Sequence, residues 1–468
     1  MAESTYDAII IGAGIGGLVC GCYLAKAGMK VLICEQHSRP GGYCTSFKRQ
    51  GFTFDAAAHC FGGYRENGIT RKVFHELGID KKISVRKSDP SDIVMTPEHK
   101  VSYWADLDHT IEDFQSAFPK ERDGIKDFFS FLVSPDPQFF TRIRSWTLQD
   151  LLDRYFSDSK LKALLSAPLL GLGGLPPSLM SAFVGVKLFS EFLLDGGYHP
   201  TGGMQSLPDA LAKQFKEFGG KLLLSCPVQR ILANNRQVTG ITVAQNVFIP
   251  SRNVISACDA RQTFVTLIGK ENIEPSFYRA LQSMRPSISN FVAYLGLDNH
   301  FKALPRTGST ICFFSHYDLL KAYRAIERGN LETYGGFMFY ISEKAPTVLA
   351  IVPTPYRTKS YWAKRKPFFL DSFINRLEKC AIPHLTRHLV YKEAATPHTL
   401  QRYTLNYRGA SFGWAGTPAQ LAKTDFRKPS FMKGLFLTGH WTTQGLGISG
   451  VVYVGQDTAK MLLRKEKR

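Results

Sequence analysis

Three glycines near the start of the chain have the spacing of a turn that binds phosphate. Gly12, Gly14 and Gly17 follow a β-branched apolar run at 8–11, and a helical pattern follows them. In such a turn Gly12 allows the tight bend, Gly14 lets a pyrophosphate approach the backbone, and Gly17 lets helix and strand pack closely. The free N–H groups at the helix N-terminus attract the phosphates. The stretch therefore predicts a strand, a turn and a helix that bind a nucleotide.

An acidic residue further along the chain strengthens this prediction. The helix is expected to end at Gly28, and a second apolar strand at 30–34 ends on Glu35, whose carboxylate can accept the ribose hydroxyls. Strand, helix, second strand and acid all fall at the offsets of a dinucleotide-binding unit. We therefore predict dinucleotide binding, and a chance glycine turn is the alternative.

A glycine pair soon after the acid indicates which dinucleotide is bound. Gly41 and Gly42 let the backbone run close to a second part of the same cofactor, which an NAD-only site does not need. The pattern E-x5-GG-x2-T, followed by G-F-x-F-D at 51–55, resembles the FAD-binding signature of the phytoene desaturase, carotenoid isomerase and flavin amine oxidase superfamily. Many members carry Arg after the glycine pair, where this chain has Tyr43.

Two later segments resemble further cofactor-binding parts of the same superfamily. The block at 202–260 is similar to its second cofactor segment, in which the residue at Val228 would pack its backbone against the adenine. Further on, a strand at 434–439 is followed by the glycine-rich turn 445–450. In the family this turn lies under the flavin ring, where backbone amides can stabilise negative charge.

Two histidines are candidates for proton transfer beside the flavin. His59 follows the G-F-x-F-D signature, and His440 occupies the place where the family often has an Asp after the strand glycine. Imidazole titrates near neutral pH, which suits a general acid or base; the alternative for each is a structural histidine that packs a loop. The stretch 408–414 resembles the family's substrate-side motif, so Phe412 and Trp414 are predicted to contact the substrate.

The residues predicted to bind FAD come from all three segments, and no metal site is predicted. Three separate motifs in the correct order are more specific than any one of them. The predicted cofactor-binding residues are Gly12, Gly14, Ile15, Gly16, Gly17, Glu35, Gln36, Gly41, Gly42, Thr45, Val228, Gly439, Gly445, Gly447, Ile448 and Gly450.

These motifs predict an α/β protein with two domains. The first is a discontinuous, Rossmann-type FAD-binding domain formed by residues 1–90, 200–282 and 400–468. The second is an α+β substrate-binding domain formed by residues 91–199 and 283–399, with an apolar helical insert. Its apolar strands lack a helix after each strand, which favours an antiparallel sheet.

The apolar insert is Leu161–Leu194, which Pro and Gly residues interrupt. Neither half reaches the roughly 20 uninterrupted apolar residues that a membrane-spanning helix needs. One interpretation is two buried helices with a glycine-rich link. The other is a functional surface, which is either the wall of a substrate tunnel or a patch that inserts into a membrane surface. Upstream, 110–132 is predicted to form one amphipathic helix, and Thr147 is predicted to cap the next helix.

The chain carries an excess of positive charge. Its 468 residues include 58 Lys and Arg against 39 Asp and Glu, a net charge of +19, which favours an anionic partner. We find no motif that reads nucleic acid and expect none to bind, which leaves an acidic membrane surface. Basic and aromatic residues are interleaved at 356–369, which suits a lipid headgroup interface as well as an ordinary solvated face.

The N-terminal residues and the cysteines bear on where the protein works. The first residues lack the basic region of a signal peptide, and the nine cysteines include no CxxC pair. We therefore expect reduced, mostly buried thiols in a cytoplasmic protein that contacts a membrane surface peripherally.

The composition favours a long hydrophobic substrate, because the insert is apolar, aromatic content is 12%, and no cluster of acids stands ready to bind an amine. The resemblance is strongest to the branch of phytoene desaturases, carotenoid isomerases and retinol saturases. It implies an FAD-dependent enzyme that acts on C=C bonds of a polyene or another isoprenoid or acyl chain, and a desaturase of this kind would pass electrons to a quinone or O2. The alternatives are a flavin oxidase or dehydrogenase of a smaller substrate such as an amine, and a prenyl-lipid escort protein, which would lack the intact glycine pattern.

Overall fold

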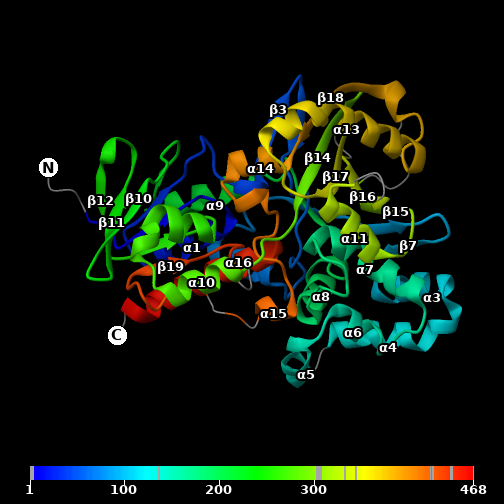
Figure 1. Ribbon diagram of the computed structural model, residues 1–468, viewed down its shortest axis with the longest axis horizontal. Coiled ribbons are helices and arrows are strands. Elements are labelled where there is room, and N and C mark those ends of the chain that lie inside the picture. Colours follow the sequence, from blue (N-terminus) through cyan, green and yellow to red (C-terminus); the bar gives the residue numbers. More distant parts are fainter. Residues whose placement is uncertain are drawn as a thin grey trace.

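The computed structural model has two halves, each built on its own β-sheet (Figure 1). The half on the left of Figure 1 holds a parallel sheet, and the half on the right holds a larger, mostly antiparallel sheet with the helical insert beside it. The structure describes residues 5–134, 137–301, 308–330, 334–342, 345–421, 423, 426–442 and 446–466.

A five-stranded parallel sheet forms the core of the left half, in the order β19-β13-β1-β2-β9. Its central strands are buried along their whole length, which is typical of strands that are covered on both faces. The strands are β1 (Ala8–Ile11), β2 (Val31–Cys34), β9 (Lys221–Leu223), β13 (Val254–Ser256) and β19 (Leu435–Leu437).

The two faces of this sheet have different covers. Helices cover one face: α1 (Ile15–Lys26), α2 (Ile69–Leu77), α9 (Ser206–Glu217) and α16 (Gly447–Glu466). A three-stranded antiparallel sheet, a π-helical segment at 262–269 and a helix cover the other face. These strands and this helix are β10 (Arg230–Asn234), β11 (Gln237–Thr242), β12 (Phe248–Pro250) and α10 (Pro275–Ser283).

A seven-stranded sheet organises the right half, in the order β18-β14-β17-β16-β15-β6-β7. Every neighbouring pair is antiparallel except β15 and β6, which are parallel. The strands are β6 (Asp92–Met95), β7 (Lys100–Tyr103), β14 (Ser289–Leu297), β15 (Thr310–Phe314), β16 (Gly336–Ile341), β17 (Thr347–Thr354) and β18 (Leu389–Ala395).

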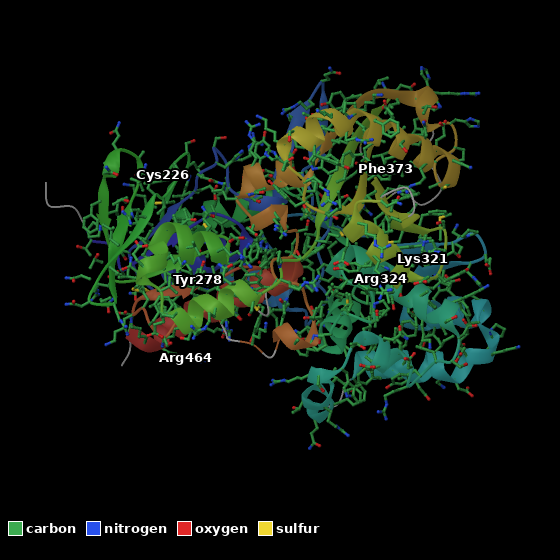
Figure 2. All side chains as sticks on the ribbon, viewed as in Figure 1. Cys226, Tyr278, Lys321, Arg324, Phe373 and Arg464 are labelled. Carbon is green, nitrogen blue, oxygen red and sulfur yellow. The ribbon has the colours of Figure 1, made fainter. Side chains whose placement is uncertain are left out.

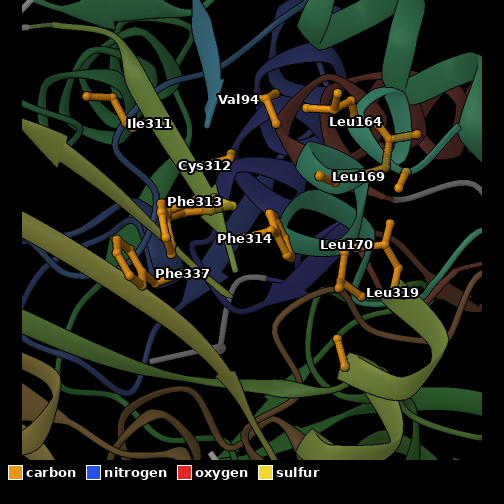
Figure 3. Packing of buried hydrophobic residues seen from close by; sticks show 14 of the residues in the cluster. Val94, Leu164, Leu169, Leu170, Ile311, Cys312, Phe313, Phe314, Leu319 and Phe337 are labelled. Carbon is orange, nitrogen blue, oxygen red and sulfur yellow. The ribbon is translucent and has the colours of Figure 1, made fainter. Parts of the chain in front are cut away.

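Alternate residues of this sheet point to opposite sides, so its two faces have different partners. One face packs on α13 (Lys359–Cys380), where Phe291 and Phe337 both contact Phe373. The helix α11 (Leu319–Arg328) contacts β17 and the insert helix at 159–173. The other face packs on α7 (Ser159–Gly173) of the insert. Figure 3 shows Val94 and Cys312 on the side of the strands where Leu164 and Leu170 of α7 lie.

Short elements join the two halves. They are β3 (Ser46–Arg49) and β4 (Phe52–Asp55), which pair with each other, β5 (Val85–Lys87) and β8 (Tyr198–Pro200), which also pair, and the helices α14 (Pro397–Thr404) and α15 (Pro418–Leu421). Phe54 of β4 packs with Val292 and Tyr294 of the large sheet, so this hairpin closes one end of the interface between the halves.

Short helices form the apolar insert and the segment before it, and one predicted element in that preceding segment is wrong. The stretch 110–132 is not one helix but two, because Pro119 follows the end of α3 and a 3-10 turn separates the helices. Thr147 caps α6 as predicted and forms a capping box with Asp150. The helices are α3 (Leu107–Ala117), α4 (Arg122–Val133), α5 (Pro137–Arg142), α6 (Leu148–Leu152), α7 and α8 (Ala182–Leu188).

The predicted fold class is confirmed: a Rossmann-type parallel sheet is joined to a substrate half with an antiparallel sheet and an apolar helical insert. The apolar stretch forms two largely buried helices, α7 and α8, with a glycine-rich link. Among the described residues, no helix is both long enough and apolar enough to cross a membrane.

Candidate functional site

A cavity of about 340 Å³ lies where the two halves meet, and all three glycine-bearing segments reach it. Gly14 and Gly42 line it from the N-terminal segments, and Gly439 and Gly447 line it from the C-terminal segment. Segments more than 400 residues apart therefore surround one site, as an FAD-binding fold requires.

Each glycine of the first turn meets a different steric demand. Gly12 has a left-handed φ of +99°, which glycine adopts without strain. A Cβ at Gly17 would lie 2.3 Å from the Gly12 carbonyl oxygen, so a side chain there would disrupt the packing of α1 on the turn. A Cβ at Gly14 would meet nothing within 4 Å, because this position borders the cavity. Gly14 is thus the one of these three glycines at which a ligand, not the protein, needs the space.

The start of α1 can bind an anion. The N-cap residue is Gly14, so no side chain caps the helix. Its first N–H groups therefore remain available at the cavity, together with the positive end of the helix dipole. The Gly41 N–H donates to the Ala13 carbonyl over 2.9 Å, which holds the glycine pair beside this helix end.

Glu35 directly follows β2 and is anchored by the backbone around it. Its Oε2 accepts from the Ala13 N–H over 2.7 Å, and its Oε1 accepts from the His37 N–H over 2.8 Å. These bonds orient the carboxylate at the cavity wall, where its remaining lone pairs can accept hydroxyl groups.

The C-terminal turn packs directly on α1. A Cβ at Gly16 would lie 2.9 Å from the Gly439 Cα, so the two backbones approach without side chains between them. Gly439 has a φ of +85° and turns the chain after β19. The start of α16, with Gly447 and Ile448, then forms another part of the cavity wall.

A polar network beside this turn fixes the protonation of His440. Asn406 Oδ1 lies 2.7 Å from Trp441 Nε1, which can only donate, so this Asn406 atom is an acceptor. The same oxygen lies 3.3 Å from His440 Nε2, which therefore carries the hydrogen. The His440 ring stacks on Tyr43, whose hydroxyl donates to the Ala410 carbonyl over 3.0 Å. The lone pair of His440 thus lies on Nδ1, and burial lowers the pKa of this histidine to about 4.

His59 belongs to a buried cluster at another part of the cavity wall. Its Nε2 lies 2.9 Å from Thr310 Oγ1, and its ring stacks on Tyr340, on which His199 also stacks. Burial lowers the pKa of His59 to about 4, and a hydrogen bond with the Ala57 backbone partly offsets this shift. Burial also lowers the pKa of His199 to about 3. Both rings are therefore neutral at pH 7.

Two buried polar atoms in the cavity wall lack a partner. Gln262 Oε1 and Asn290 Oδ1 accept no hydrogen bond from any described residue. Unsatisfied buried polar atoms are costly, so their presence at a cavity indicates a polar ligand. The open space at Gly14, the uncapped α1 and the anchored Glu35 fit a large cofactor that carries phosphates and ribose.

The family of the chain follows from comparison with known proteins. A family model described as flavin containing amine oxidoreductase matches residues 15–463. The chain belongs to this family. FAD is its cofactor, and the chain is an FAD-dependent enzyme.

Curated relatives match nearly the whole chain at low identity. All-trans-retinol 13,14-reductase of Danio rerio is 25% identical, over 92% of this chain and 82% of its own length. Prolycopene isomerase of Daucus carota is 28% identical over 96% and 78%, and a lycopene-forming phytoene desaturase of Pseudescherichia vulneris is 26% identical over 97% and 98%. Among solved structures, cyclohexylamine oxidase of Brevibacterium oxydans has a TM-score of 0.67, with 17% identity over 99% of this chain and 100% of its own; it shares the fold.

Most residues predicted to bind FAD lie around the cavity, as do His59, His440 and Phe412. Thr45 instead closes its own turn by a bond to the Gly42 carbonyl, and Gly450 lies beyond the cavity wall on α16. Gly445 lies outside the described residues. The predicted residues that line the cavity are Gly12, Gly14, Ile15, Gly16, Gly17, Glu35, Gln36, Gly41, Gly42, Val228, Gly439, Gly447 and Ile448.

Trp414 lies away from this cavity. It is buried, and its Nε1 donates to the Trp441 carbonyl over 2.9 Å. It lines a smaller neighbouring cavity, which Phe412 separates from the main one because Phe412 borders both.

Several cavity residues are not apparent from the sequence. The polar ones include Gln262, Asn290, Asn406 and Ser411, and the apolar ones from the insert and the large sheet are Leu172, Leu188, Phe192, Met338 and Ile351. The insert was predicted as a possible tunnel wall, and three of the apolar residues come from it. The register of the large sheet places the others, and no local motif marks them.

The first prediction separates the role of Gly14 in binding from that of Gly17 in folding. Gly14→Val should leave the melting temperature of the apoprotein within about 2 °C, because Gly14 has an ordinary φ of −67° and open space for a Cβ. It should weaken FAD binding by at least about tenfold, measured by quenching of flavin fluorescence. Gly17→Val, the matched control, should yield little folded protein. Normal FAD affinity in Gly14→Val would contradict the placement of the pyrophosphate.

The second prediction concerns the stability of the apoprotein in acid. The pKa of His440 is lowered from 6.5 to about 4, so below pH 6.5 the unfolded chain takes up a proton that the folded chain does not. Stability should fall between pH 6.5 and 5.0, and His440→Gln should reduce that loss by about 1.5 kcal/mol, measured by denaturant unfolding. His300→Gln, at an exposed position, should leave the loss unchanged. If stability falls by the same amount between pH 6.5 and 5.0 in both variants, His440 is already protonated in the folded protein over this pH range.

Proposed function

We propose that this enzyme uses FAD to act on carbon–carbon double bonds of a long hydrophobic polyene, such as a carotenoid or another isoprenoid chain. The single observation that carries the proposal is the composition of the cavity. One part is lined by glycine-rich backbone, and another part is lined by apolar side chains from the insert and the large sheet, namely Leu172, Leu188, Phe192, Met338 and Ile351.

The register of the large sheet supports a binding path for an extended chain. Met338 of β16 pairs directly with Ile351 of β17, so their side chains lie beside each other on one face. Gly171 of α7 faces Met338 so closely that a Cβ there would lie 1.8 Å from the Met338 sulfur. The helix α8 and the segment after it contribute Leu188 and Phe192, and the Phe192 ring lies against Gly447 at the start of α16. An apolar chain would therefore lie across the strands, between the insert and the cofactor.

The charges around the cavity argue against an amine substrate. Among the described residues that line it, only Glu35 carries a charge at pH 7, and both of its oxygens already accept backbone N–H groups. A protonated amine would have no carboxylate near the apolar part to replace its hydration. A flavin oxidase or dehydrogenase of a smaller substrate remains the second candidate, because the family model is that of amine oxidoreductases.

The names of the relatives add support. They describe a reductase of all-trans-retinol, an isomerase of prolycopene and a desaturase of phytoene, all conjugated or isoprenoid chains. Because these three reactions differ, we propose the substrate class and leave desaturation, isomerisation and saturation as outcomes of the experiment below. A quinone or O2 would accept the electrons of a desaturase.

The protein would orient the chain, exclude water and accept a proton, while bound flavin supplies the electron and hydride chemistry. Of the two histidines, His440 is better placed for the proton, because its Nδ1 carries a lone pair at the cavity. His59 is bonded to Thr310 and to the Ala57 backbone, which suits a role in shaping the wall.

We also infer that one half binds the cofactor and the other half binds the substrate, as predicted. Residues 1–90, 200–282 and 400–468 would form the FAD-binding domain, and 91–199 and 283–399 the substrate-binding domain. The support is that the parallel sheet draws all its strands from the first set and the seven-stranded sheet draws all its strands from the second.

The third prediction tests the polyene proposal. Anaerobic titration of the yellow holoenzyme with a poly-cis carotene should shift the flavin spectrum. Leu172→Glu should weaken this binding by at least about tenfold, because it places a carboxylate in the apolar part of the cavity, and FAD affinity should not change. Leu179→Glu, at an exposed position of the insert, is the matched control and should bind like the wild type.

The same titration identifies the reaction class. Conversion that needs a reductant but gives no net oxidation or reduction of the product indicates isomerisation. Conversion with bleaching of oxidised flavin indicates desaturation, and conversion that consumes the reductant and removes a double bond indicates saturation. If neither carotenes nor retinoids perturb the flavin while an alkylamine bleaches it, the amine oxidase alternative holds and the polyene proposal fails.

We further propose that α13 contacts an anionic membrane surface, from which a polyene would be drawn. Tyr361, Lys364, Arg365 and Phe368 follow each other at helical spacing on the solvent-exposed side of α13, and 61% of Phe368 is exposed. Aromatic rings beside basic groups suit a headgroup interface. In Figure 2, Phe373 marks α13, whose opposite side packs on the sheet.

The fourth prediction tests this surface by flotation with vesicles. Lys364→Glu with Arg365→Glu should reduce binding to phosphatidylserine vesicles by at least about tenfold, since each basic residue near an anionic surface contributes about 1 kcal/mol. Lys321→Glu with Arg324→Glu on α11, both labelled in Figure 2, changes the net charge equally and should bind as the wild type does. Equal loss in both pairs would indicate attraction by overall charge without a defined surface.

A further inference from the structure

A pair of polar residues interrupts the otherwise apolar part of the cavity wall. Asn290 near the start of β14 and Ser411 in the loop after α14 both line the cavity, and Asn290 Nδ2 donates to Ser411 Oγ over 2.8 Å. Asn290 is nine-tenths buried. The pair comes from segments 121 residues apart, so the fold brings together two polar side chains at a site where apolar ones would suffice.

The pair has unused hydrogen-bonding capacity. Asn290 Oδ1 is buried and accepts no bond from any described residue. The Ser411 hydroxyl accepts from Asn290, and no acceptor for its own proton lies among the residues that the structure describes. One free acceptor and one free donor therefore lie side by side, and leaving the buried Asn290 oxygen unpaired is costly.

We propose that Asn290 and Ser411 form a subsite for the hydroxyl group of a substrate alcohol, so that the enzyme prefers polyene alcohols to polyene hydrocarbons. This inference rests on the proposed function, because it adds a polar anchor to the same cavity. The substrate oxygen would accept from the Ser411 hydroxyl and donate its proton to Asn290 Oδ1.

A hydroxyl group fits this pair better than other oxygen groups do. If the Asn290 amide is flipped, so that its oxygen and nitrogen exchange places, its NH2 becomes the free donor and Ser411 becomes the free acceptor. An alcohol again satisfies both groups. A carbonyl oxygen accepts only, and in the observed orientation it would face Asn290 Oδ1 without a hydrogen between them. A carboxylate would bring a charge into a wall where none of the described residues offers a cation.

The position of the pair defines which end of the chain it would hold. On β14, Asn290 lies two residues before Val292, which pairs with Ile351, and Ile351 pairs with Met338. Asn290 therefore lies on the same face as the apolar strip and beside it. His59 lies beyond the other side of this strip, where it bonds Thr310. A hydroxyl bound at Asn290 would fix how far the chain extends along the strip and thus which double bond meets the flavin.

The test compares two ligands that differ by one oxygen atom. The probes are all-trans-retinol and the hydrocarbon in which its CH2OH group is replaced by CH3. Each is titrated anaerobically into the holoenzyme, and the flavin absorbance shift gives its Kd. The wild type should bind the alcohol about tenfold more tightly than the hydrocarbon. In Asn290→Leu the ratio of the hydrocarbon Kd to the alcohol Kd should fall to about one, while the Kd of the hydrocarbon stays within about twofold of the wild-type value.

Two further variants and one further measurement complete the design. Ser411→Ala should also reduce the ratio of the two Kd values, and this variant replaces Asn290→Leu in the test if Asn290→Leu fails to fold. Ile351→Val should weaken both ligands equally and leave the ratio unchanged, because it trims only the apolar strip. The Kd of FAD is measured for each variant.

The outcomes separate the subsite from the proposed function. If the wild type binds both probes equally and the Asn290 and Ser411 variants keep that equality, the subsite is refuted while the polyene proposal stands. If Asn290→Leu weakens FAD binding and leaves the ligand ratio intact, the pair serves the cofactor and the subsite is again refuted. If neither probe perturbs the wild-type flavin, the polyene proposal and the subsite fail together.

Discussion

The cofactor cavity depends on main-chain segments that approach each other more closely than side chains would allow. Gly16 meets Gly439, and Gly17 meets the carbonyl of Gly12, at distances at which an added Cβ would overlap the backbone. These contacts join the first strand–turn–helix unit to the turn after β19. Everything else in the site is positioned from this junction, because the uncapped end of α1, the glycine pair and the start of α16 all border the cavity that it creates.

Among the described residues, the charged side chains lie almost entirely outside the wall of the cofactor cavity. The chain has a net charge of +19, yet a single charged residue, Glu35, is found among the described residues of the cavity wall, and the backbone holds it. The histidines near the cavity are neutral because burial lowers their pKa. A low-dielectric cavity of this kind strengthens each remaining hydrogen bond, so a few polar atoms can orient a cofactor and a substrate.

The sequence predicted those features that depend on local backbone geometry. The turn at Gly12, the acid at Glu35 and the glycine pair each follow a short pattern, because a tight bend or a close phosphate constrains only neighbouring residues. The contribution of Asn290, Met338 and Ile351 depends on pairing between distant strands, which no short pattern records. The helix expected at 110–132 was wrong because the apolar periodicity continues on both sides of Pro119.

The topology of the parallel sheet also bears on the order of events during synthesis. Its last strand, β19, pairs with β13, and the turn after β19 supplies part of the cavity wall. Nascent chain that still lacks its final few dozen residues therefore presents an incomplete nucleotide cradle. The flavin can therefore be enclosed fully only after β19 has paired with β13.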